Sequence, residues 1–272
     1  RIRCHENTNI STGNTMKPIV GNRKLTLVGY GFVGKAMHHV LHKWHEIKIV
    51  DPQYNENKIE NDSDGYVICV PTPSSHDGSC DFSIVEDVVR QCPKDKPILV
   101  KSTICLEGWR NLHQYEKSLN FSPEFLTAAN SILDAESKEH MLLGGPDTDF
   151  WSGVFLMYKK ILAPIEELIL TKYIINCFLA SKVSFFNDIY KLCKATNVDY
   201  DKVCDLVQTD DRIGSSHMQV PGPDGQMGFG GMCFPKDTKA LIHTGMHFRS
   251  PMTLLNEIVA LNDIVRDDNE PL

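Results

Sequence analysis

Short apolar runs alternate with helix-like stretches over the first half of the chain. A run at residues 24–28 ends at Gly29, and residues 35–41 then favour a helix. Residues 83–91 also suit a helix, and further strand-like runs lie at residues 47–50, 65–70, 97–101 and 141–143. Strands and helices that alternate in this way predict a parallel sheet with helical crossovers. The first half is therefore expected to be an α/β domain.

The pattern changes at residue 164, where about thirty residues follow without an internal Gly or Pro. Apolar side chains cover most of the girth of this stretch, which predicts one long helix over residues 164–195. Beyond a stop at Thr196-Asn197 we expect a short helix, a Gly- and Pro-rich loop from Gly214 to Gly231, and a helix with Pro235 at its first position. The predicted fold class is α/β: a Rossmann-like parallel sheet domain, then a long central helix and a smaller all-α domain.

The composition excludes several function classes. The 272 residues are 42% hydrophobic and 23% charged, which excludes a disordered chain. A formal net charge of −7 provides no positive field for nucleic acid or an anionic membrane. The chain lacks a run of about 18–20 consecutive apolar residues, and its N-terminus lacks the apolar run of a signal peptide. We expect a soluble cytoplasmic protein that binds neither nucleic acid nor membrane, with reduced cysteines and no metal site.

The sequence Gly29-Tyr30-Gly31-Phe32-Val33-Gly34 has the spacing of a dinucleotide-binding turn. In such a turn the first glycine makes the bend, the second admits a pyrophosphate and the third lets the helix pack on the strand. Asp51 closes the next predicted strand. Its carboxylate can accept both ribose hydroxyls and would repel a 2′-phosphate, which favours NAD over NADP. The alternative is a βαβ turn without a ligand and an aspartate that only caps it.

These patterns predict three segments. We expect residues 1–16 to be a disordered leader and residues 17–163 to be an NAD-binding Rossmann domain. Residues 164–272 are expected to combine the central helix with a helical domain for substrate binding and dimerisation. A helix that is apolar on most sides needs a further cover, so a homodimer through this helix is expected. The alternative is that both faces are covered within one chain.

Cys233 follows a glycine-rich loop and precedes the helix that Pro235 opens. The helix dipole and the nearby Lys236 favour a thiolate at this position, so Cys233 is a candidate nucleophile. The three glycines of the loop, Gly228, Gly230 and Gly231, bring backbone amides close to a ligand. The alternative, a buried structural thiol, is assigned to Cys69, Cys80, Cys92, Cys177, Cys193 and Cys204.

Lys172 and Asn176 lie four residues apart in the predicted long helix and so share one face among apolar residues. An ammonium with a neighbouring carboxamide can stabilise an oxyanion or relay a proton; the alternative is a lysine that snorkels to solvent. Glu124 and Thr103 follow strand-like runs, on the side where α/β sheets bind ligands.

Together these stretches resemble the UDP-glucose/GDP-mannose dehydrogenase family from Lys24 to about Arg266, and most closely its members that oxidise UDP-glucose. The resemblance rests, in order, on the Gly29–Gly34 turn, Val70-Pro71-Thr72-Pro73, Lys101-Ser102-Thr103, Ser122-Pro123-Glu124-Phe125-Leu126, Lys172 with Asn176, Asp211-Arg212-Ile213-Gly214, and Gly228-Phe229-Gly230-Gly231 leading to Cys233-Phe234-Pro235-Lys236-Asp237-Thr238. The last stretch is the most specific.

The resemblance implies an NAD-dependent four-electron oxidation of UDP-glucose to UDP-glucuronate through a thiohemiacetal and a thioester on Cys233. The catalytic residues that it implies are Cys233, Lys172, Asn176, Glu124, Asp237 and Thr103. The cofactor would contact Gly29, Gly31, Phe32, Val33, Gly34, Asp51, Thr72, Thr103 and Lys236. The UDP-sugar would contact Glu124, Phe125, Leu126, Lys172, Asn176, Arg212, Phe229, Gly230, Gly231 and Cys233, with Arg212 reaching it across a dimer interface.

The sequence also departs from the family. The usual C-terminal UDP-binding domain is expected to be absent, and Ala128 stands where a second acidic residue is common. The sequence leaves four alternatives open. They are the same reaction on GDP-mannose, the same reaction on a UDP-N-acetylhexosamine, a single-oxidation β-hydroxyacid dehydrogenase, and a catalytically impaired NAD-binding remnant.

Overall fold

A computed structural model describes residues 22–116 and 118–267. The expected leader at residues 1–16 lies outside the described residues. Five parallel strands form the main sheet in the order β2-β1-β3-β4-β5. Their bounds are Glu46–Val50 for β2, Lys24–Val28 for β1, Gly65–Ile68 for β3, Ile98–Val100 for β4 and Leu119–Phe121 for β5. The predicted parallel sheet is therefore confirmed.

A second, two-stranded parallel sheet pairs β6 (His140–Leu143) with β7 (Lys159–Leu162). An antiparallel bridge between Phe121 and Gly144 connects it to the edge of the main sheet. The predicted strands at residues 65–70 and 97–101 are shorter than expected. β3 leaves the sheet before Pro71, and β4 begins after Pro97, a residue that has no N–H to donate to a ladder.

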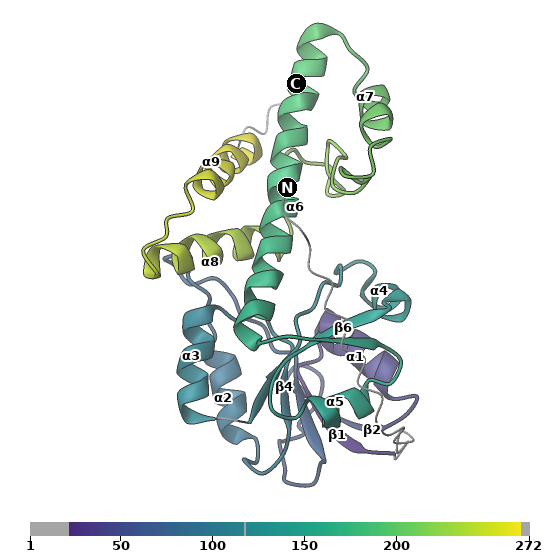
Figure 1. Ribbon diagram of the computed structural model, residues 1–272, viewed down its shortest axis with the longest axis vertical. Helices are drawn as coiled ribbons and strands as arrows, with labels where there is room; N and C mark the ends of the chain where they lie inside the picture. The colour runs from purple at the N-terminus through teal and green to yellow at the C-terminus, as the bar shows by residue number, and fades with distance from the viewer. Residues whose placement is uncertain (1–21, 117, 268–272) are drawn as a thin grey trace, which may run out of the picture.

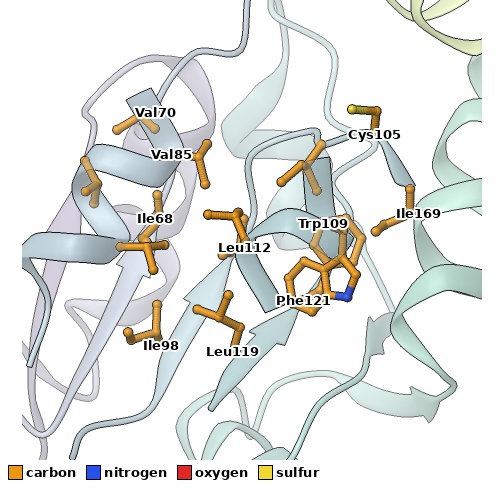
Figure 2. Close-up of a cluster of buried hydrophobic side chains, with 14 of the residues drawn as sticks. Ile68, Val70, Val85, Ile98, Cys105, Trp109, Leu112, Leu119, Phe121 and Ile169 are labelled. Atoms are coloured by element: carbon orange, nitrogen blue, oxygen red, sulfur yellow. The ribbon is translucent and has the colours of Figure 1, made fainter. Parts of the chain in front are cut away.

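Helices cover both faces of the main sheet (Figure 1). One face packs against α2 (Ser83–Gln91), α3 (Leu106–Tyr115) and the start of α6, around Ile68, Val100 and Phe121 (Figure 2). The other face packs against α1 (Phe32–Leu41), α4 (Ser131–Ser137) and α5 (Thr148–Val154), around Val67 and Leu99. Neighbouring residues of one strand thus point to opposite cores, as the pleat requires.

The predicted long helix is α6, Ile165–Thr196, which begins after Pro164 and ends at Asn197 in a left-handed conformation. In Figure 1 it runs from the sheet past α7 (Tyr200–Val207) on one side, with α8 (Phe234–His247) and α9 (Thr253–Asp267) on the other. Pro235 is the second residue of α8, because Phe234 is the first and Cys233 caps the helix. The expectation of proline at the first position was one residue off.

By length and composition, α6 is also apolar enough to cross a membrane, with a mean hydropathy of 1.3 over its most apolar window. The expectation concerned consecutive apolar residues, and polar residues such as Lys172 and Asn176 do interrupt the run, but the average over the window stays high. In the fold, Ile169 and Tyr173 join the sheet core and Phe186 packs against Tyr200. The polar side chains of Lys172, Asn176 and Asn187 are buried as well. This burial is typical of the core helix of a folded domain.

Candidate active site

The glycine turn lies between β1 and α1, at the carboxyl edge of the sheet. Gly29 has φ +92°, and a Cβ there would lie 2.6 Å from the carbonyl oxygen of Cys69. A Cβ on Gly34 would lie 2.1 Å from the carbonyl oxygen of Gly29, so the third glycine allows the helix to pack on the turn. A Cβ on Gly31 would meet nothing within 4 Å.

The space at Gly31 fits a dinucleotide. Gly31 caps α1 without a side-chain hydrogen bond, so the first N–H groups of the helix face a position that no side chain of the turn fills. Phe32 and Val33 form the first turn of α1 and pack against the apolar core on that face. The residues present therefore suit a pyrophosphate at this point.

Asp51 follows β2 and lies beside the same turn. One carboxylate oxygen accepts the N–H of Tyr30 at 2.6 Å, and the other accepts the N–H of Gln53 at 2.8 Å. The ring of Tyr54 packs on that of Tyr30, with centroids 4.6 Å apart. These contacts cap the turn, and each oxygen keeps a lone pair that a ribose hydroxyl could use.

Two threonines follow the next strands at the same edge. Thr72 is buried in the segment after β3, and Thr103 is half-buried after β4. Thr103 accepts a weak hydrogen bond at its carbonyl oxygen from the Cys80 thiol, 3.8 Å away. Parallel strands end at one edge, so both residues belong to the edge that carries the glycine turn.

A buried polar cluster connects α6 with the start of α8. Asp237 is 1% exposed, and its carboxylate accepts from the Asn176 amide and the Lys236 ammonium, each at 2.6 Å. The N–H of Asp237 donates to the carbonyl oxygen of Cys233 at 2.8 Å. Cys233 is half-buried at the cap of α8, one turn before Asp237. The side chain of Lys236 thus pairs with Asp237.

Lys172 lies one turn before Asn176 on α6 and is 7% exposed, so it does not snorkel to solvent. Its ammonium donates to the backbone carbonyl oxygen of Glu124 at 2.5 Å. Burial lowers the pKa of Lys172, and the facing Asp237 and Cys233 partly offset this shift. The ammonium lies 5.2 Å from the ring centroid of Phe125. Lys172 therefore joins the α8 cluster to the segment after β5.

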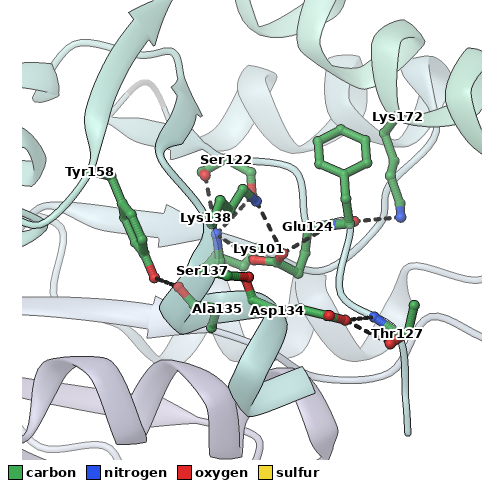
Figure 3. A network of polar contacts seen from close by, with 11 residues as sticks. Lys101, Ser122, Glu124, Thr127, Asp134, Ala135, Ser137, Lys138, Tyr158 and Lys172 are labelled. Carbon is green, nitrogen blue, oxygen red and sulfur yellow. Dashed lines mark hydrogen bonds and ion pairs between the residues drawn. The ribbon is translucent and has the colours of Figure 1, made fainter. Parts of the chain in front are cut away.

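The Glu124 carboxylate points away from Lys172 (Figure 3). It lies 3.2 Å from the ammonium of Lys101 and 3.3 Å from that of Lys138. Burial alone would raise the pKa of this carboxyl, but the two ammonium groups hold it below its usual range. Glu124 therefore contacts Lys172 through its backbone carbonyl oxygen and not through its carboxylate. Leu126 is buried two residues later, whereas Ala128 is exposed.

The glycine loop before Cys233 is held from two helices. Asn187 of α6 accepts the N–H of Gly228 at 2.9 Å, and Asn262 of α9 accepts the N–H of Phe229 at 2.6 Å. Arg266 donates to the carbonyl oxygen of Phe229 at 2.7 Å and lies over Gly230, where a Cβ would be 2.0 Å from its guanidinium. Gly231 has φ +75°, which glycine adopts without strain.

Arg212 is not brought to this cluster within one chain. Its side chain is 87% exposed and pairs with Asp210, two residues earlier. The sequence reasoning did not identify Lys101, Lys138, Asn187, Asn262 or Arg266 as residues of the site. Asn187 carried a usable signal, since it lies about three turns beyond Asn176 on an apolar helix and thus shares its face.

An open pocket of about 270 Å³ adjoins this arrangement and is lined by Phe125, Leu126, Asp134, Ser137 and Lys138. Among the residues that the structure describes, no group of three or more His, Cys, Asp or Glu side chains could hold a metal ion. The site can therefore offer backbone amides at a helix start, one half-buried thiol and a set of buried ammonium and carboxamide groups.

Comparison with known proteins matches both halves of the chain. Residues 54–162 match the NAD binding domain of the UDP-glucose/GDP-mannose dehydrogenase family, and residues 167–264 match its central domain. The chain is 30% identical over 220 residues to UDP-glucose 6-dehydrogenase TuaD of Bacillus subtilis, covering 74% of this chain and 46% of that protein. A UDP-glucose 6-dehydrogenase of Rickettsia bellii is 31% identical over 206 residues, covering 69% and 46%. The chain thus spans about half the length of these relatives.

Two solved structures show the same fold. A UDP-glucose dehydrogenase from Pyrobaculum islandicum has a TM-score of 0.79 at 25% identity, covering 92% of this chain and 70% of that one. A 3-hydroxyisobutyrate dehydrogenase from Mycobacterium tuberculosis has a TM-score of 0.71 at 15% identity, covering 91% and 95%, a likeness of fold alone. The domain matches extend over both the sheet and the helices, including the segment that carries Cys233. The chain belongs to the UDP-glucose/GDP-mannose dehydrogenase family, and its N-terminal part contains that family's NAD-binding domain.

Proposed function

We propose that this chain oxidises UDP-glucose to UDP-glucuronate in two NAD-dependent steps, through a thioester on Cys233. The observation that carries the proposal is the buried cluster of Lys172, Asn176 and Asp237, with Asp237 one turn after the half-buried Cys233 on α8. Buried ammonium and carboxamide donors near a thiol suit a reaction in which the attack of the thiolate on a carbonyl carbon places negative charge on the carbonyl oxygen. The NAD site lies in the sheet part, up to residue 163, and the helical part from residue 164 binds the sugar nucleotide.

NAD, when bound, accepts one hydride at each of two oxidations, so that four electrons leave the C6 carbon in total. The glycine turn holds its pyrophosphate and Asp51 holds its ribose hydroxyls. In the first oxidation the C6 hydroxyl also loses a proton to solvent, and the alcohol becomes an aldehyde. The Cys233 sulfur then forms a bond to the aldehyde carbon, and the resulting thiohemiacetal cannot diffuse away.

Lys172 and Asn176 act on the oxygen of this thiohemiacetal. Their N–H groups stabilise the negative charge that forms on this oxygen when the thiolate adds, and that becomes the carbonyl bond of the thioester as the second hydride leaves. Water then attacks the thioester carbon, the carbon–sulfur bond breaks, and the thiol regains its proton. Asp237 positions Asn176, and Thr103 at the end of β4 holds the attacking water. Loss of one such oxyanion donor lowers turnover by about a hundredfold to a thousandfold.

The experiment that tests this proposal counts NADH formed per sugar nucleotide consumed. We expect two NADH per UDP-glucose and little turnover of GDP-mannose or a UDP-N-acetylhexosamine. Cys233→Ser is expected to abolish the two-step reaction, whereas Cys204→Ser, a half-buried thiol on α7, serves as the matched control. One NADH per substrate, unchanged in Cys233→Ser, would indicate a single-oxidation alcohol dehydrogenase. Binding of NAD without turnover would indicate an impaired remnant.

The same helix that carries Lys172 supports a homodimer. Ile174, Phe178, Phe185 and Leu192 of α6 are 58%, 67%, 60% and 58% exposed. Their spacing places all four on one face of the helix, because successive residues advance by about 100°. A continuous exposed apolar stripe of this kind marks a protein–protein contact. We propose that the same stripe of a second copy of the chain packs against it. In this dimer Arg212 would lie close enough to reach the partner's site.

A further inference from the structure

The Glu124 carboxylate is shared by one buried and one half-buried ammonium group, an arrangement that the proposed reaction does not use directly. Lys101 comes from the end of β4 and is 3% exposed at its side chain, while Lys138 comes from the end of α4 and is 23% exposed. Phe125 adds its N–H to the same carboxylate at 2.8 Å. The carboxylate thus has charged partners from two elements and a backbone donor of its own segment.

The charges around Glu124 do not balance. Lys101, Lys138 and, behind the backbone, Lys172 all carry ammonium groups. The other titratable neighbours are Tyr158 and Cys69, and burial raises the pKa of each to about 12. Both are therefore neutral near pH 7. One carboxylate consequently separates Lys101 from Lys138, and the charge of Lys101 adds to burial in lowering the pKa of Lys138.

The two lysines are held differently. Lys101 also donates to the hydroxyl oxygen of Ser122 at 3.1 Å and to its carbonyl oxygen at 3.4 Å, so other contacts fix its position. Lys138 contacts Glu124 and lies 5.3 Å from the ring centroid of Phe125, at the wall of the open pocket. Lys138 is therefore the partner whose contact with the carboxylate can change while the fold stays intact.

We propose that Lys138 is a positioning residue: its ammonium, opposite that of Lys101, holds the Glu124 carboxylate in place, and this anchors the backbone carbonyl that Lys172 contacts. The inference rests on the proposed function of Lys172. Glu124 is held from opposite sides, by its carboxylate through Lys101 and Lys138 and by its carbonyl through Lys172. When the carboxylate of Glu124 is released, its backbone carbonyl can move with it. Lys138 therefore acts on Lys172 through Glu124.

A first experiment needs no activity. It measures the midpoint of thermal unfolding near pH 7 for Lys138→Met, Glu124→Gln and the double variant. Lys138→Met alone is expected to lower the midpoint, because the carboxylate loses one of its two counter-charges. In the Glu124→Gln background it is expected to raise the midpoint, because it removes the repulsion between Lys101 and Lys138. The same sign in both backgrounds would overturn the proposal.

Two further variants complete this cycle. Lys138→Arg keeps the charge and is expected to restore the midpoint. Lys43→Met is the control, because Lys43 pairs at an exposed position with Glu136 of α4. This change is expected to shift the midpoint by the same amount in the wild-type background and in the Glu124→Gln background. A background-dependent effect of Lys43→Met would also count against the proposal, since any lysine near α4 would then behave alike.

A second experiment reads the reaction with UDP-glucose as substrate. When Glu124 takes up a proton its hold on the lysines is lost, so kcat is expected to fall on the acidic side. Lys138→Met removes a charge that lowers the pKa of Glu124, and this acid limb should move upward by about one pH unit. An unshifted limb would overturn the proposal. If the wild-type chain does not turn over UDP-glucose, the proposed function fails, while the unfolding cycle still decides the role of Lys138.

Discussion

The amide of Asn176 on α6 donates to the carboxylate of Asp237 on α8 at 2.6 Å. Each of these residues lies one turn after a candidate reacting group, Asn176 after Lys172 and Asp237 after Cys233. The hydrogen bond therefore fixes two helical turns against each other, and with them the distance between the ammonium and the thiol. Both partners are buried, which keeps water from competing for the bond.

Asp237→Asn is expected to narrow the pH range of activity from the alkaline side. The Asp237 carboxylate raises the pKa of Lys172 against the effect of burial. Without it this pKa falls, and the charged ammonium is lost at a lower pH as the pH increases. The alkaline limb of the kcat profile should therefore move to lower pH. Asp201→Asn, at an exposed carboxylate on α7, is the control and should leave the pH profile unchanged. The same pH profile for wild type and Asp237→Asn would contradict the role given to Asp237.

Alanine at the second and third glycines of the turn should separate cofactor binding from folding. Gly34→Ala places a Cβ against the backbone of Gly29 and is expected to reduce the free energy of unfolding by about 1–3 kcal/mol. Gly31→Ala meets nothing and has φ −69°, so unfolding should change by less than about 0.5 kcal/mol. Its NAD affinity, measured by calorimetry, should nevertheless fall at least about tenfold. Unchanged NAD binding in Gly31→Ala would refute the placement of the pyrophosphate.

Asn262→Ala is expected to loosen the glycine loop. The N–H of Phe229, a residue 3% exposed, would lose its acceptor, which costs about 1–3 kcal/mol of unfolding free energy. Hydrogen exchange at Gly228 and Phe229 should become faster, and KM for the sugar nucleotide should rise. Asn256→Ala, whose amide donates only to the carbonyl oxygen of Met252 just before α9, should leave the unfolding free energy, the exchange rate and KM unchanged. If exchange at Phe229 stays slow, another group must hold the loop.

Phe178→Glu and Phe185→Glu should each convert a dimer into a monomer, because a carboxylate at the centre of an apolar contact must lose its water. Sedimentation or light scattering at micromolar concentration measures this change. Leu133→Glu, at a 64% exposed position on α4, provides the matched control. A wild-type chain that is already monomeric would show that the exposed stripe of α6 has some other role.

The parts of the fold that the sequence predicted well depend on residues close to one another along the chain. The helix at residues 83–91 has the observed bounds of α2, and the turn from Gly29 to Gly34 joins β1 to α1 as its glycine spacing indicates. The strand ends were less accurate, because pairing stops where a neighbouring strand stops rather than where the apolar run does. For β4, the proline at residue 97 was a local signal that the strand begins only at Ile98.

The contacts of the site were harder to predict because they join distant segments. Nothing in the sequence near Glu124 shows that Lys101 and Lys138 enclose its carboxylate, since both come to it only when β4, β5 and α4 are assembled. The same holds for Asn262, which meets Phe229 from another helix. By contrast, Lys172 and Asn176 were predicted to share a face, because helical spacing alone places them there. Their proposed roles remain predictions.

The helix α6 connects two contacts that lie about three turns apart, Asn176 with Asp237 and Asn187 with Gly228. One added or deleted residue between these positions would rotate everything beyond it by about 100° and shift it by about 1.5 Å along the axis. The glycine loop and the thiol could then no longer meet the same helix at the same time. The segment between Asn176 and Asn187 should accordingly tolerate no change in its length.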